Sequence, residues 1–118
     1  MQQYAFYGSL RRGMENFEQF RHGLRFLFQT VISGYRLHAM SHYPYAVYSG
    51  REEDKMTVEV FEIVNSGVER EIHELETQVG YVLDTVAIEG VPTGIYLFPE
   101  AGPEPLVKEG DWVKFFGH

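Results

Sequence analysis

The sequence of 118 residues contains no cysteine. This excludes disulfides, thiolate metal ligands and a cysteine nucleophile, and it is typical of proteins from a reducing compartment. No apolar run is long enough to span a membrane. The start of the chain, Met1-Gln2-Gln3, lacks the basic residues that open a signal peptide. We therefore expect a cytoplasmic protein with no membrane partner.

Basic residues are also scarce, since ten lysines and arginines stand against seventeen acidic residues, for a formal net charge of −7. Nucleic-acid binding needs a net positive face, so we expect no nucleic-acid partner. Apolar residues make up 44% of the chain, enough for a core of its own. The length fits one domain covering 1–118. We expect a small-molecule partner, and the sequence indicates no oligomeric state.

Apolar runs and turn residues divide the chain into predicted elements. One or two helical turns are predicted over 15–20, and the main helix begins at Ser66. An α+β fold follows, with a mixed, barrel-like sheet of about six or seven strands and one main helix. The predicted extended segments are 4–7, 24–28, 35–40, 45–48, 56–63, 81–88 and 95–98, with a last one over 106–116.

The main helix has clear signals at both ends. Ser66 and Glu69 are three residues apart, the spacing of a capping box, in which each side chain binds a free backbone N–H group. Gly80 is a typical C-terminal stop. Between these ends, apolar residues recur at helical spacing and predict an amphipathic helix; they are Val68, Ile72, Leu75 and Val79.

Two carboxylates flank this apolar stripe. At 100° per residue, Glu71 and Glu76 lie on opposite sides of it, each about 70° from its centre. Partial burial there would raise the pKa of a carboxyl group and suit it to general acid–base catalysis. On periodicity alone both are better interpreted as surface glutamates, and periodicity does not choose between them.

Histidine and serine give little support for other chemistries. His38 and His42 are four residues apart, as in a helical zinc pair, but the segment is predicted to be strand and turn, so we expect no metal site. No serine lies in a Gly-x-Ser-x-Gly elbow, which argues against a serine hydrolase.

The loop between Gly8 and Gly13 follows an apolar, aromatic strand. It lacks the spacing of a dinucleotide loop and the lysine of a P-loop. A glycine and a small hydroxyl residue at the rim of a sheet expose backbone N–H groups, which can bind an anion such as a carboxylate. The alternative is a plain turn with two solvated arginines, in which Ser9 forms turn hydrogen bonds.

Several motifs, in order along nearly the whole chain, resemble those of the γ-glutamylcyclotransferase-like superfamily. The first is the loop Tyr-Gly-Ser-Leu-Arg-Arg-Gly at 7–13, followed by an asparagine at the expected place. The C-terminal part of the main helix, at 73–76, resembles the family segment whose last glutamate is the acid–base residue. The other matching elements are Gly-Tyr-Arg-Leu at 34–37, Tyr-Pro at 43–44, Glu-Val-Phe-Glu-Ile at 59–63 and Gly-Asp-Trp at 110–112.

This resemblance selects Glu76 over Glu71 as the catalytic residue. It implies release of 5-oxoproline from a γ-glutamyl amine or peptide, with no metal and no organic cofactor. It also implies that Tyr7 forms a pocket wall and that the hydroxyl group of Tyr81 orients Glu76. The implied substrate-binding residues are Tyr7, Gly8, Ser9, Leu10 and Tyr81.

The sequence departs from the family pattern beside the expected pocket. The family usually places a glycine and a tyrosine directly after the glutamate, whereas here they come at Gly80 and Tyr81. The following strand usually carries arginines, and 82–85 has none. A non-catalytic binding module of the same fold, recognising a glutamyl-like ligand, is the alternative, although such a binder has no need for a carboxylate facing a bound anion.

Overall fold

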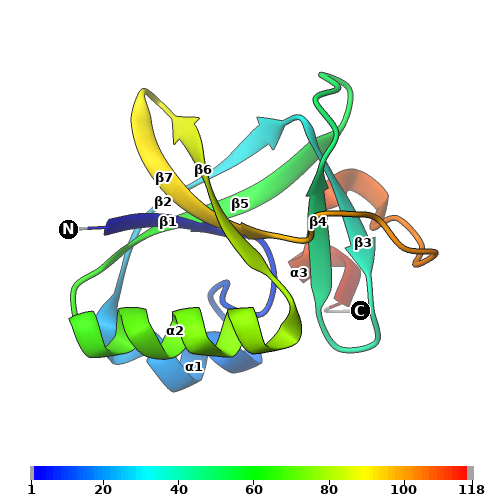
Figure 1. Cartoon of the computed structure of the whole chain (residues 1–118). Coiled ribbons are helices and arrows are strands. Elements are labelled where there is room, and N and C mark those ends of the chain that lie inside the picture. Colours follow the sequence, from blue (N-terminus) through cyan, green and yellow to red (C-terminus); the bar gives the residue numbers. More distant parts are fainter. Residues whose placement is uncertain (1, 117–118) are drawn as a thin grey trace.

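A computed structural model describes residues 2–116, without the side chains of Gln2 and Lys108. Its main feature is a five-stranded sheet in the order β2-β5-β1-β7-β6 (Figure 1). The β1–β7 pair is parallel and the other pairs are antiparallel, so the sheet is mixed. These strands are β1 (Gln2–Phe6), β2 (Leu24–Ser33), β5 (Lys55–Ile63), β6 (Val82–Ile88) and β7 (Val91–Leu97).

A separate antiparallel hairpin stands beside this sheet and consists of β3 (Tyr35–Ala39) and β4 (Pro44–Tyr48). The chain leaves β2 for the hairpin at Gly34, whose φ of 95° is accessible to glycine with little strain. The carbonyl oxygen of Gly34 accepts hydrogen bonds from the N–H groups of Ser49 and Gly50. This closes the base of the hairpin.

The helices lie on the side of the sheet drawn below it in Figure 1 or next to the hairpin. The longest, α2 (Ser66–Val79), runs across the view, with α1 (Glu15–Phe20) behind it and α3 (Trp112–Phe116) near the hairpin. Two short 3-10 turns are η1 (Arg21–Gly23) and η2 (Lys108–Gly110). Within residues 2–116, none of the helices has the length and apolar character needed to cross a membrane.

The α+β prediction is confirmed, with seven strands in mixed sheets and one main helix. The barrel-like form is wrong, because the sheet does not close. Strands β2 and β6 are its two edges and are not paired with each other. After β2 the chain does not continue this sheet but forms the separate β3–β4 hairpin.

Two local predictions also differ from the structure. Helix α2 is capped by Asn65 and not by Ser66, since the Asn65 Oδ1 accepts hydrogen bonds from the N–H groups of Gly67 and Val68. The segment 106–116 is mostly helical and not extended. Its aromatic residues at 112, 115 and 116 have the i, i+3 and i+4 spacing that brings their rings together on a helix.

The core forms on both faces of β5. Met56, Val58 and Val60 are fully buried on one face, as the alternation predicts. The other face is buried as well, and Phe61 packs there against the rings of Phe6, Phe17 and Phe26. Strand β5 is therefore covered on both sides. The polar Glu59 on this strand is consequently only 2% exposed.

Candidate active site

A cavity of about 180 Å³ opens between the end of β1, the start of β4 and the C-terminal half of α2. Its walls are largely apolar and aromatic. Of the residues that line it, Glu76 alone carries a carboxylate, and none is a lysine or an arginine. The lining residues are Ala5, Phe6, Tyr7, Gly8, Ser9, Leu10, Asn16, Tyr43, Pro44, Leu75, Glu76, Val79, Tyr81 and Tyr96.

Glu76 lies on the side of α2 that faces this cavity and is partly buried. Its carboxylate forms no hydrogen bond or ion pair with any described residue. Burial without a compensating cation raises the pKa of Glu76 to about 7. Glu71, the other candidate, is exposed and is not among the cavity residues.

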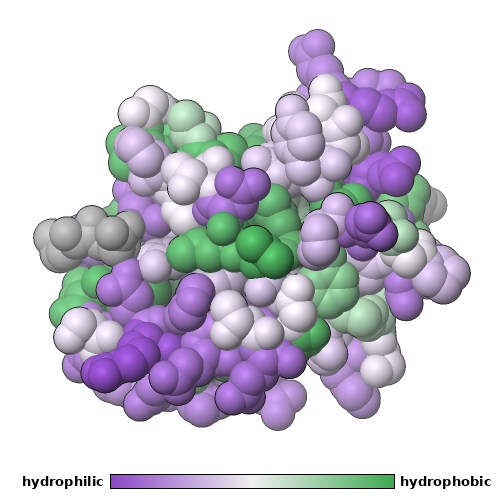
Figure 2. Space-filling view, viewed as in Figure 1, coloured by the Kyte–Doolittle hydropathy of each residue, from purple (hydrophilic) through white to green (hydrophobic). Residues whose placement is uncertain are grey.

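The outer side of α2 is polar, as the amphipathic pattern predicts. Figure 2 shows hydrophilic side chains over α2 and hydrophobic ones above it, where β6 crosses this face. Val68 and Ile72 are buried on the inner side of the helix, and Leu75 is partly buried. Val79 is 40% exposed and lies at the edge of the cavity. The helix stops at Gly80, whose left-handed conformation confirms the predicted C-terminal cap.

The loop after β1 forms the wall of the cavity at Gly8, Ser9 and Leu10. Its carbonyl groups are used within the fold: the N–H of Arg11 donates to the Gly8 oxygen, at 3.0 Å, and the N–H of Phe17 to the Ser9 oxygen, at 3.1 Å. Outside the sheet ladders, the N–H groups of residues 8 to 10 donate no hydrogen bond to the described residues. These donors at the cavity wall are suited to binding an anion.

The side chain of Ser9 has a structural partner. Its Oγ accepts a hydrogen bond from the Nδ2 of Asn16, at 2.9 Å. Asn16 lies in α1, so this bond ties the loop to that helix. Asn16 also lines the cavity. The family motif predicted an asparagine at this position but assigned it no role.

The two arginines of this loop are not both solvated. Arg11 is only 3% exposed, and its guanidinium group lies 2.8 Å from carboxylate oxygens of both Glu59 and Asp111. Arg12 is more exposed, but its backbone N–H and its Nε both donate to Glu59. The plain, solvated turn is therefore the wrong interpretation. Ion pairs of Arg11 and Arg12 with the buried Glu59, and of Arg11 with Asp111, therefore fix the loop.

The two predicted pocket tyrosines line the cavity, but their hydroxyl groups bind the backbone. Tyr7 donates to the carbonyl oxygen of Tyr96 and accepts from the N–H of Ala46. Tyr81 donates to the carbonyl oxygen of Pro44. The expectation that the Tyr81 hydroxyl orients Glu76 is therefore wrong. Burial raises the pKa of both phenols and keeps them neutral.

Sequence reasoning did not assign a role to Tyr96, which lies in β7 and contributes to the cavity wall. Its position in an alternating strand predicts burial but not what it faces. His38 is buried with its Nδ1 2.8 Å from the Glu104 carbonyl oxygen, whereas His42 is exposed. In the described part of the chain, no three metal-ligating side chains gather. The absence of a metal in the reaction stays a prediction.

A family model and a solved structure both match nearly the whole chain. The family model described as gamma-glutamyl cyclotransferase, AIG2-like, matches residues 4–114. The uncharacterized protein PH0828 from Pyrococcus horikoshii is 28% identical with a TM-score of 0.81, over 97% of this chain and 92% of that one. No curated protein matches the chain.

Two further structures share the fold at lower identity. The uropathogenic Escherichia coli-specific protein c4763 is 18% identical with a TM-score of 0.83, over 99% of this chain and 96% of that one. An AIG2-like protein from Mus musculus is 18% identical with a TM-score of 0.68, over 87% of this chain and 80% of that one. With the family model matching nearly the whole chain, this protein belongs to the AIG2-like gamma-glutamyl cyclotransferase family.

Proposed function

We propose that this protein releases 5-oxoproline from a γ-glutamyl amine or peptide, with Glu76 as the general acid and base. The observation that carries the proposal is the carboxylate of Glu76, which has no hydrogen-bond or ion-pair partner among the described residues, in a largely apolar cavity that the loop residues 8 to 10 also line. A pKa of about 7 suits a group that must both accept and give up a proton near neutral pH. Family membership supports the same reaction class.

In this reaction the α-amine of the substrate attacks the carbonyl carbon of its own γ-amide, so the protein supplies no nucleophile. The N–H groups of Gly8, Ser9 and Leu10 bind the substrate carboxylate or the oxyanion that develops at the γ-carbonyl. Tyr7 and Tyr81 form rigid walls, because their hydroxyl groups are fixed to the backbone. The enclosed substrate is thereby held with its amine close to its carbonyl.

Within this site, Glu76 moves one proton across the reaction. It accepts the proton from the attacking nitrogen after the new C–N bond forms. It then donates that proton to the nitrogen of the departing amine as the old C–N bond breaks. The products are 5-oxoproline and a neutral amine, and Glu76 returns to its ionised form.

The test compares Glu76→Gln with Glu71→Gln, a change of an exposed glutamate on the same helix. Release of 5-oxoproline is measured from γ-glutamyl amines, γ-glutamyl peptides and ε-linked γ-glutamyl-lysine. Glutamine keeps the size of the side chain but transfers no proton, so we expect a loss of about 10²–10⁴-fold for Glu76→Gln. Glu71→Gln should match the wild type.

Two outcomes would overturn the proposal. Turnover that survives in Glu76→Gln would remove the assigned role of the carboxylate. A wild-type protein that binds 5-oxoproline but turns over none of these substrates would favour a non-catalytic binding module.

A further inference from the structure

The cavity has a hydrogen-bonded connection to the protein surface that the mechanism above does not use. Tyr96 is 3% exposed and lines the cavity. Its hydroxyl group lies 3.0 Å from the Nδ1 of His73, and the two rings are 5.9 Å apart. His73 is exposed and lies on α2 three residues before Glu76, one turn of the helix away.

The proposed reaction, on which this inference rests, leaves one proton for such a path. An α-ammonium group carries three protons, and the lactam nitrogen of 5-oxoproline keeps one. Glu76 transfers one of the other two to the departing amine. The remaining proton must leave before the attack, because an ammonium nitrogen has no lone pair with which to form a bond.

We propose that Tyr96 and His73 carry this first proton from the cavity to solvent. The Tyr96 oxygen accepts the proton from the substrate ammonium while its own O–H proton passes to the His73 Nδ1. The exposed ring of His73 then releases a proton to water. Outside the protein, the departed neutral amine takes up one proton, so the number of protons balances over the whole reaction.

The surroundings of Tyr96 favour a phenol that passes a proton on without remaining ionised. Burial raises the pKa of Tyr96, and the neighbouring Tyr4, Glu76 and Glu69 raise it further. Tyr96 is therefore neutral before and after the transfer. The charged neighbours of His73 on its own helix are Glu69, Arg70 and Glu76, one turn to either side. The phenol of Tyr96 reaches it from β7, and Tyr4 lies beside that ring.

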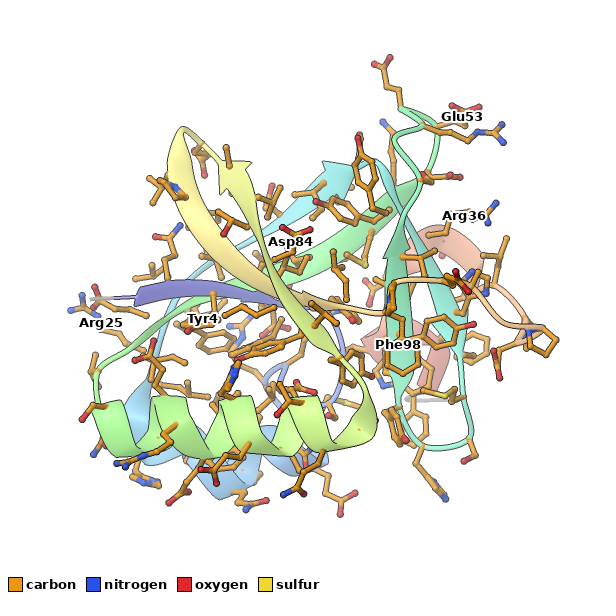
Figure 3. All side chains as sticks on the ribbon, in the orientation of Figure 1. Tyr4, Arg25, Arg36, Glu53, Asp84 and Phe98 are labelled. Atoms are coloured by element: carbon orange, nitrogen blue, oxygen red, sulfur yellow. The ribbon has the colours of Figure 1, made fainter. Side chains whose placement is uncertain are left out.

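Tyr4 provides a control for a purely structural role of Tyr96. Tyr4 extends from β1 toward α2 (Figure 3), and its hydroxyl group donates to Glu69, at 2.8 Å. The rings of Tyr4 and Tyr96 are stacked 6.2 Å apart. Their hydroxyl groups bind residues of α2, so both phenols tie this helix to the sheet. Tyr4 is not among the cavity residues. It shares the tethering role of Tyr96 but has no access to the substrate.

The experiment measures kcat between pH 6 and pH 10 with a γ-glutamyl alkylamide, for the wild type, Tyr96→Phe, His73→Ala and Tyr4→Phe. At pH 7 we expect a loss of about tenfold for Tyr96→Phe and His73→Ala, less than for a group that donates directly to the reacting atoms. The loss should disappear above the pKa of the substrate amine, near 8 or higher, where the amine arrives without its extra proton. Added imidazole should restore His73→Ala but not Tyr96→Phe.

A tether alone would give a different result. Equal losses at every pH in Tyr96→Phe, His73→Ala and Tyr4→Phe, with no effect of imidazole, would overturn the proton path and leave the cyclotransferase reaction standing. A wild type with no turnover would overturn the proposed function and the path together. Thermal unfolding of each variant shows whether a loss comes from misfolding.

Discussion

Arg11 and Asp111 are a hundred positions apart in the chain, and the guanidinium Nη1 of one lies 2.8 Å from a carboxylate oxygen of the other. The Nε of the same guanidinium group binds Glu59 on β5, also at 2.8 Å. Arg11 follows directly after the cavity loop, and its N–H binds the carbonyl oxygen of Gly8. The wall of the cavity is therefore fixed to the sheet and to the C-terminal segment through one buried cation.

Removal of this cation should be strongly destabilising. Arg11→Met leaves Glu59, which is 2% exposed, and Asp111, which is 8% exposed, with less compensation for their charges. Breaking a buried ion pair in this way costs about 3–5 kcal/mol. We expect the free energy of unfolding, measured in urea, to fall by an amount in this range.

The matched control is Arg51→Met. Arg51 also pairs with a carboxylate, that of Glu53, but both side chains are exposed. Exposed pairs contribute little to stability because water and salt screen them. If the two substitutions lowered stability equally, the buried ion cluster would not be the feature that holds the loop.

The N-terminus of α2 gives a second pair of variants. Asn65→Ala removes the oxygen that accepts from Gly67 at 2.8 Å and Val68 at 3.1 Å, and should cost about 0.5–2 kcal/mol in urea unfolding. Ser66→Ala should have little effect, since the Ser66 side chain forms no hydrogen bond among the described residues. A larger loss of stability in Ser66→Ala than in Asn65→Ala would instead support the capping box that the spacing of Ser66 and Glu69 predicts.

Local signals in the sequence predicted much of the fold, because the interactions that decide these elements are local. The stop at Gly80 is an example, since a left-handed residue at the end of a helix favours glycine strongly. The strand over 56–63 is another, because its apolar residues are dense enough to form the core. The helical end of the chain was missed. Trp112 is buried there, and its neighbour Asp111 pairs with Arg11, which is a hundred positions away.

The candidate site shows the same limit. Glu71 and Glu76 are symmetric about the apolar stripe, but only Glu76 lines the cavity. The other walls of this cavity come from segments distant in the chain, such as the loop over 8–10 and Pro44. The motif resemblance chose Glu76, which periodicity did not. The partner of the Tyr81 hydroxyl, the Pro44 carbonyl, is 37 positions away, and no pattern along the chain predicts such a contact.

The cavity wall at Gly8 has no room for a side chain. A Cβ at this position would lie 2.8 Å from the Cδ and Cγ of Pro44, which also lines the cavity. Gly8→Ala should therefore force the loop and Pro44 apart, at a cost of about 1–3 kcal/mol in stability. It should also weaken binding of 5-oxoproline, measured by calorimetry.

Gly67→Ala is the comparison for this glycine. Its Cβ would meet only the Asn65 side-chain oxygen, at 3.1 Å, in the first turn of α2. Alanine has a higher helix propensity than glycine, so the stability of Gly67→Ala should be unchanged or slightly higher.

Normal ligand binding by Gly8→Ala would show that the loop does not contact the ligand.

The last prediction concerns the pH dependence of stability. Burial raises the pKa of Glu76 to about 7 in the folded protein, whereas an unfolded glutamate titrates near pH ~4.3. Between these values the folded state binds more protons than the unfolded state. The free energy of unfolding therefore falls as the pH rises from ~4.3 to about 7, and above 7 the contribution of Glu76 levels off. At about 1.36 kcal/mol per pKa unit, the shift corresponds to a loss of up to about 4 kcal/mol.

Glu76→Gln removes this titration, so it should be more stable than the wild type at pH 8 and similar to it at pH 4.5. The comparison is made by urea unfolding at both pH values. Because both proteins contain the same histidines and the same Asp111, the titrations of these groups cancel in the difference. Burial raises the Asp111 pKa, but its bond to Arg11 outweighs this and lowers it, which places that titration below the window. A stability difference that does not change between pH 4.5 and pH 8 would show that Glu76 ionises as an ordinary surface carboxylate, and would remove the property that suits it to proton transfer near neutral pH.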